Sequence, residues 1–157
     1  MLPEDEYEIT MVGLSAEQAK NLSKGIRGIQ RTQNVQELAQ LYSEADVLIN
    51  PTYEDNFPTV NIEALACGTH VITYRTGGSP EAIREGGERK EGKESIESYP
   101  TGVVIEQGNV TALANAIMQM RDKPLSSTDC CKRAEELFDK DKCLEKYVEL
   151  YEEIADI

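Results

Sequence analysis

The chain has 157 residues, of which 39% are hydrophobic, enough for one domain with a single core. Its 16 Lys and Arg against 29 Asp and Glu give a formal net charge of −13, which would repel polyanions and argues against nucleic-acid binding. We expect no transmembrane segment and a cytoplasmic location, because no apolar run approaches the roughly 20 residues of a membrane span and the N-terminus lacks a basic, apolar signal.

The first part of the chain alternates strand patterns with helix patterns. Ser15 and Gln18 have the spacing of a capping box, which predicts a helix that closes at Gly25. Asn34 can cap a second helix, because the aliphatic residues behind it recur at helical spacing. The expected strands are 7–13 and a short one at 26–30, and the expected helices are 15–25 and 34–45.

Residues 46–81 predict one βαβ unit. The segments DVLIN and HVITY are rich in aliphatic residues and stop at turn residues, as short buried strands do. Between them, Pro58 suits the first helical position and Gly68 suits the stop. The apolar residues at helical spacing are Val60, Ala64 and Cys67. An acidic loop therefore leads from the first strand to a helix, and a Gly-Gly turn follows the second strand.

The rest of the chain predicts a short helix at 80–84, a last strand at 101–108 and a helix at 109–120. We interpret residues 85–100 as a mobile loop, because the segment is charged, glycine-rich and almost free of apolar residues. Two more helices follow Ser126, separated near 139–141. The apolar stripes expected to pack are Val110, Leu113, Ile117 and Met120 in the first of these three helices and Leu144, Tyr147, Val148 and Tyr151 in the last.

Strands and helices thus alternate at intervals of roughly 15 residues, the pattern of a parallel sheet covered by helices. We expect the α/β class, with one Rossmann-like domain over residues 1–157, helices on both faces of a parallel sheet and additional C-terminal helices.

The cysteines and the single histidine do not indicate a metal site. Cys67, Cys130, Cys131 and Cys143 form no Cys-x-x-Cys pair, and His70 begins a predicted strand. We interpret the cysteines as buried or incidental thiols in a reducing compartment and His70 as a structural residue. Neither a zinc site nor a nucleophile–histidine arrangement is expected.

The acidic loop before the helix near Pro58 is the candidate site, because ligands of open parallel sheets bind at the carboxyl ends of the strands. A helix N-terminus there suits a phosphate oxygen. Glu63, roughly 7.5 Å further along the helix axis, could accept hydrogen bonds from ribose hydroxyls, and Asp55 or Glu54 could do so for a second sugar.

Two other interpretations of these acids remain open. Asp55 and Glu54 are also the residue types that cap helices and offset their dipoles, and Glu63 could be an ordinary solvated helix residue. A pair of carboxylates could equally act as general acid and base, as in glycoside hydrolysis. Spacing in the sequence does not separate these possibilities.

The segment PTYEDNFPTVNIEALACGTHVITYRTGGSPE resembles the nucleotide-sugar-binding C-terminal domain of the group-one retaining glycosyltransferases, which have the two-domain GT-B architecture. The flanking LAQLYSEADVLINPT and GVVIEQGNVTALANAI are also similar to that family, so the resemblance covers about residues 5–121. Its most specific element is a Glu-x7-Glu pair, represented here by Asp55 and Glu63. The first acid is Asp where the family usually has Glu.

The resemblance implies a role for each part of this segment. Glu63 would bind the ribose, and Asp55, with Glu54 beside it, would lie near the transferred sugar. The residues implied to contact phosphate and sugar are Asn56, Phe57, Pro58, Thr59 and Val60. The loop implied to border the base is Gly28, Ile29, Gln30, Arg31 and Thr32. The donor substrate would be a nucleoside-diphosphate sugar, with no further cofactor and no metal.

Family members are typically more than twice this length. They have an N-terminal acceptor-binding domain and, just before this region, an Arg and Lys pair that neutralises the diphosphate. Neither is present here. We interpret Lys20 and Lys24, on the predicted helix 15–25, as surface residues. The resemblance therefore implies the donor-binding half of a hexosyl transferase, peripheral at the inner membrane face or cytoplasmic, with no catalytic residue in this domain alone. Alternatives are a nucleotide-sugar epimerase or phosphorylase domain and a noncatalytic α/β protein-interaction module.

Overall fold

The computed structural model describes residues 2–3, 5–83 and 96–155, in which strands alternate with helices. The strands are β1 (Ile9–Val12), β2 (Ile26–Ile29), β3 (Val47–Asn50), β4 (His70–Tyr74), β5 (Ile96–Tyr99) and β6 (Gly102–Ile105). The helices are α1 (Ala16–Lys20), α2 (Val35–Glu44), α3 (Thr59–Ala66), α4 (Ser79–Ile83), α5 (Val110–Asp122), α6 (Ser127–Phe138) and α7 (Lys140–Ala155). The α/β class expected from the sequence is confirmed.

A four-stranded sheet in the order β3-β4-β6-β5 forms the centre of the fold. Its first three strands are parallel, and β5 pairs antiparallel with β6 at one edge. All five residues of β4 are buried, as the continuous apolar pattern of HVITY predicts for a strand covered on both faces. The parallel strands place their carboxyl ends at the same edge of the sheet.

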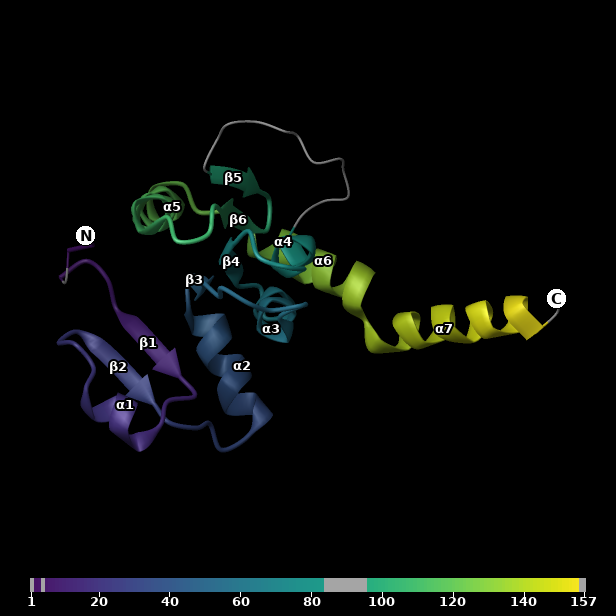
Figure 1. Ribbon diagram of the computed structural model, residues 1–157, viewed down its shortest axis with the longest axis horizontal. Coiled ribbons are helices and arrows are strands. Elements are labelled where there is room, and N and C mark those ends of the chain that lie inside the picture. The colour runs from purple at the N-terminus through teal and green to yellow at the C-terminus, as the bar shows by residue number, and fades with distance from the viewer. Residues whose placement is uncertain (1, 4, 84–95, 156–157) are drawn as a thin grey trace.

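Helices cover both faces of this sheet (Figure 1), which confirms the layered arrangement expected. On one face, Val71 of β4 packs with residues of α3, α4 and α6, among them the fully buried Leu65 and Ile83. On the other face, Ile72 packs against α5 through Ile117. Because successive residues of a strand point to opposite faces, one β-branched strand contributes to both cores. Each fully buried aliphatic side chain stabilises the fold by roughly 1.5–3 kcal/mol.

The sheet is less continuous than the expectation of one parallel sheet. β1 and β2 pair in parallel as a separate two-stranded sheet, which lies with α1 away from the main core (Figure 1). All four residues of β1 are exposed. The capping box of Ser15 and Gln18 is present, but α1 ends at Lys20, since the backbone N–H of Asn21 already closes the helix on Gln18.

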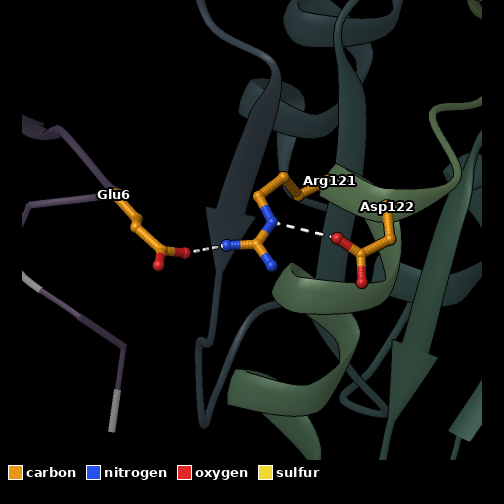
Figure 2. A network of polar contacts seen from close by, with 3 residues as sticks. All are labelled: Glu6, Arg121 and Asp122. Atoms are coloured by element: carbon orange, nitrogen blue, oxygen red, sulfur yellow. Dashed lines mark hydrogen bonds and ion pairs between the residues drawn. The ribbon is translucent and has the colours of Figure 1, made fainter.

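The segment before β1 attaches this smaller sheet to α5. Arg121 on α5 forms an ion pair with Glu6 and a second one with Asp122, its Nε 3.0 Å from the aspartate oxygen (Figure 2). Its guanidinium also lies over the ring of Tyr7, 5.4 Å from the centroid. Leu2 and Tyr7 pack against the core between the sheet and α5. Because the ion pairs are exposed, this apolar packing contributes most of the attachment.

Three other expectations need correction. Part of the expected loop 85–100 is the strand β5. The edge of β6 offers hydrogen bonds to the β5 backbone, and this pairing does not depend on the charge of the β5 side chains. Residues 85–95 lie outside the described residues. Val60 is 38% exposed, since α3 buries its Asn61–Ala64–Leu65 face instead. Val110 is 68% exposed, because it is the first residue of α5 and precedes the stripe that packs.

The two C-terminal helices break at Asp139, as predicted, and α7 extends away from the sheet (Figure 1). Its apolar stripe does not pack on the described part of the chain: the exposed residues are Leu144, Tyr147, Val148, Leu150, Tyr151 and Ile154.

None of the helices in the described ranges has the length and apolar character needed to cross a membrane.

The burial of His70 predicts a loss of stability in acid. His70 is 5% exposed, and burial lowers its pKa below 6.5, although backbone groups of Asp46 and Ser126 and the charge of Asp129 oppose this. The unfolded chain therefore binds a proton that the folded chain does not, so stability is full above about pH 6.5 and is lost as the pH falls below it.

We expect the stability difference between the wild type and His70→Val to change by up to about 1.4 kcal/mol per pH unit below pH 6.5. Urea unfolding of both proteins between pH 7.5 and 5 measures it, and the carboxylates common to both cancel. A difference that does not vary with pH would contradict this assignment.

Candidate functional site

The loops that follow β3, β4 and β6 meet at one edge of the main sheet. Gln107, after β6, donates from Nε2 to the carbonyl of Tyr53 at 2.7 Å and to the hydroxyl of Thr76 at 3.1 Å. The ring of Tyr53 contacts Tyr74 edge-on, with centroids 5.7 Å apart. The side chain of Arg75 pairs with Glu106 at 2.7 Å. These contacts join three strand ends into one surface, the edge where ligands of open α/β sheets bind.

The Gly-Gly turn after β4 lies directly against the acidic loop. The N–H of Gly78 donates to the carbonyl of Asn56 at 2.7 Å. A Cβ on Gly77 would lie 1.9 Å from the carbonyl oxygen of Asp55, and one on Gly78 would lie 2.5 Å from that of Asn56. Only glycines permit this approach, so the sequence of the turn determines where residues 55–57 lie.

The acid at position 55 has a local structural role. Asp55 accepts the N–H of Phe57 through Oδ1 at 3.0 Å, which stabilises the turn before α3. Both Asp55 and Glu54 are exposed, and the carbonyl of Glu54 accepts from the hydroxyl of Thr52. This bond closes a turn outside the helix and is not a helix cap, so the capping interpretation of Asp55 is wrong, and its carboxylate remains at the surface beside the helix start.

The start of α3 has no capping side chain. Pro58 is the N-cap, not the first helical residue as expected, and it is buried. Because proline has no side-chain acceptor, the first-turn N–H groups of Thr59 and Val60 donate to no capping side chain, and both residues are exposed. Phe57 is 36% exposed and packs its ring against Phe138. The positive end of the helix dipole is consequently accessible at this edge.

A buried amide network below the loop was not anticipated from the sequence. Asn61 is fully buried in the first turn of α3, where it accepts from Nδ2 of Asn50 at 2.9 Å and donates to the carbonyl of Ser79 at 3.4 Å. The carbonyl of Asn50 in turn accepts from the hydroxyl of Thr73 at 2.9 Å. Asn61 therefore links the end of β3 to the turn that begins α4. Its only sequence signal was a polar residue adjacent to the predicted apolar face.

Glu63 lies one turn further along α3, exposed, on the side that faces α2. Its Oε2 accepts the hydroxyl of Tyr42 at 3.1 Å. Burial and the neighbouring carboxylate raise the pKa of Tyr42 well above its ordinary value, so the phenol stays protonated and remains a donor at neutral pH. The carboxylate of Glu63 is thus held by a residue from another helix.

The predicted site residues fall into two groups. Residues 54–60 and Glu63 form one continuous strip, from the acidic loop over the start of α3 to its middle. Of the expected base-binding residues 28–32, Gly28 and Ile29 are the last two of β2 and the other three follow it; the carbonyl of Ile29 accepts from the N–H of Gly13 in the smaller sheet. β2 belongs to the separate two-stranded sheet with β1 (Figure 1), and the base-binding role of residues 28–32 stays a prediction. Within the described ranges, no three His, Cys, Asp or Glu side chains are grouped to hold a metal ion.

Comparison with known proteins identifies the family. The model of a family described as glycosyl transferases, group 1, matches residues 2–123 of this chain. The D-inositol 3-phosphate glycosyltransferase of Pseudarthrobacter chlorophenolicus is 28% identical over 141 residues, which make up 84% of this chain and 30% of that protein. The chain thus spans less than a third of the length of this relative.

Solved structures with the same fold include two proteins whose chains are also much longer. Sucrose-phosphate synthase from Thermosynechococcus elongatus superposes with a TM-score of 0.69 at 27% identity, over 87% of this chain and 32% of that one. Anabaena HepE, solved in complex with UDP-glucose, has a TM-score of 0.62 at 19% identity, over 87% of this chain and 35% of that one. By its sequence and by the Rossmann-like fold it shares with these GT-B enzymes, the chain belongs to the group 1 glycosyl transferases.

Proposed function

We propose that this chain is the donor-binding part of a glycosyltransferase that moves a hexosyl group from a nucleoside-diphosphate sugar to an acceptor with retention of configuration. The observation that carries the proposal is the strip at the carboxyl edge of the sheet. It has an exposed acid at Asp55, a helix start without a capping side chain at Thr59, and a second exposed acid at Glu63. This order suits sugar hydroxyls, diphosphate oxygens and ribose hydroxyls, respectively.

Within this strip the chain's own groups bind and orient the donor. The α3 dipole and first-turn N–H groups would stabilise negative charge that grows on the diphosphate as the sugar departs. The acids accept hydrogen bonds from hydroxyls and take no proton in this scheme. Rate acceleration would then come from positioning and from electrostatic stabilisation, with the donor held against an acceptor.

The acceptor site is proposed to lie on an N-terminal domain outside this chain. The relatives named above are about three times as long as the segment they share with it. The Arg and Lys pair that the resemblance implies just before this region would neutralise the diphosphate, which the chain's own net charge of −13 does not favour. We therefore expect the isolated chain to bind donor and transfer no sugar. The complex of Anabaena HepE with UDP-glucose supports a nucleotide sugar as the ligand class.

Replacing either acid of the strip is expected to weaken donor binding. Each of Asp55→Ala and Glu63→Ala removes charged acceptors for sugar hydroxyls, so each should raise the dissociation constant about tenfold or more. Calorimetric titration of the chain with UDP-, GDP- and ADP-glucose measures the effect and identifies the preferred base. Glu145→Ala, an exposed acid on α7, is the matched control and should change nothing. Donor binding that neither strip variant weakens would refute the assignment.

A second candidate is a noncatalytic protein-interaction module, which the exposed apolar stripe of α7 favours. It predicts no affinity for any of the three nucleotide sugars at millimolar concentration. The same titration therefore separates the two functions.

A further inference from the structure

Among the described residues, the hydroxyl of Tyr42 is the one side-chain donor recorded on Glu63, at 3.1 Å from Oε2. We infer that Tyr42 is a positioning residue, which aims the Glu63 carboxylate at the ribose hydroxyls of a bound nucleotide. This inference rests on the proposed function and adds a residue from α2 to a strip otherwise built from α3 and the loop before it.

Tyr42 is itself held in place through its side chain and through its backbone carbonyl. Its ring packs against the core cluster that contains Leu65 and Val71. Its carbonyl accepts the hydroxyl of Thr69 at 2.5 Å and the N–H of Ala45 at 3.0 Å. The phenol thus projects from a rigid part of the fold, close to the start of β4. A donor held in this way can restrict a neighbouring side chain without moving itself.

Glu63 needs such a restriction to act on a ribose. It is exposed in the middle of a helix, where a glutamate ordinarily samples several rotamers. A carboxylate offers about four lone-pair sites on its two oxygens, and the phenol occupies one of them. The remaining sites can still accept two hydroxyls of a vicinal diol. With the orientation already set, less side-chain entropy is lost when the nucleotide binds.

The phenol also remains a donor over the whole physiological range, because burial and the Glu63 charge raise the pKa of Tyr42. The contact therefore does not switch with pH near neutrality. Its predicted effect is on the recognition of ribose hydroxyls and not on pH dependence.

The test compares ribose with 2′-deoxyribose ligands. Dissociation constants are measured for UDP, GDP and ADP and for their 2′-deoxy forms. The ribonucleotide that binds most tightly and its 2′-deoxy form are then the pair compared in the variants. The wild type should prefer the ribose form about tenfold, since one hydrogen bond to a charged carboxylate is lost with the 2′-hydroxyl. Tyr42→Phe retains the packed ring and removes only the donor, and it should reduce this preference to about threefold.

Two controls isolate the contact. Tyr7→Phe makes the same change at a buried hydroxyl on the opposite core and should leave the preference at its wild-type value. Adding Tyr42→Phe to Glu63→Ala should change the preference no further, because its effect acts through the carboxylate. Thermal unfolding of each variant reports whether the fold is retained.

The outcomes separate this inference from the proposed function. A wild-type chain that binds ribonucleotides in preference to 2′-deoxynucleotides, together with a Tyr42→Phe variant of unchanged preference, would overturn the role of Tyr42 alone. A wild-type chain that binds the nucleotides without any preference would overturn both Tyr42 and the ribose role of Glu63. A chain that binds none of the six nucleotides would overturn the proposed function as well.

Discussion

Replacing Gly77 by alanine is expected to cost about 3 kcal/mol of stability and to abolish measurable donor binding. Gly77 has a φ of 46°, which alanine adopts only with strain, and its new Cβ would lie 1.9 Å from the carbonyl oxygen of Asp55. The collision is with backbone, so it is relieved only if the acidic loop moves. The strip then loses the alignment between Asp55 and the start of α3.

Gly68→Ala separates the effect of backbone strain from the effect of the collision with the acidic loop. Gly68 also has a positive φ, of 80°, but a Cβ there meets its nearest atoms, such as Sγ of Cys131, at an ordinary 3.4 Å. It should lose only the roughly 1 kcal/mol of backbone strain and retain donor affinity. Urea unfolding and calorimetric titration of both variants are the measurements. Equal effects of Gly77→Ala and Gly68→Ala would show that the turn does not determine the position of the loop.

The second large effect is expected at Asn61. Asn61→Leu preserves volume but leaves the amide of Asn50 and the carbonyl of Ser79 without their buried partner. Desolvation of these groups should lower the free energy of unfolding by about 2–4 kcal/mol. The loss is measured by urea unfolding.

Asn115→Leu is the matched control for this change. Asn115 is an exposed residue in the middle of α5, so the same replacement there should stay within about 0.5 kcal/mol of the wild type. If Asn61→Leu were as stable as this control, the buried network would not link β3, α3 and α4 energetically.

Most elements follow from local sequence because their signals are local. The continuous apolar pattern of HVITY, the cap at Asn34 and the break at Asp139 each depend on residues within a few positions, and the structure has β4, α2 and the α6–α7 boundary there. The strip itself is contiguous in the chain, so its order along α3 was also predictable. Residues 54–60 and Glu63 could be nominated without knowing any distant contact.

Features that depend on distant partners were missed. The edge of β6 recruits β5 from a segment whose composition predicts a loop. Asn61 looks like an ordinary polar helix residue until Asn50 and Ser79 surround it. The bond between Tyr42 and Glu63 spans 21 positions and depends on how α2 packs against α3. Such pairings arise from tertiary packing, which periodicity and capping signals do not encode.

The central claim is that a nucleoside-diphosphate sugar binds along the strip from Asp55 to Glu63. Backbone amide NMR spectra of the chain, recorded during titration with UDP-, GDP- and ADP-glucose, test it most directly. We predict the largest shift changes at Asn56, Thr59, Val60 and Glu63 with one of these donors. Spectra unchanged by all three donors, or changes confined to α5 and α7, would contradict the account.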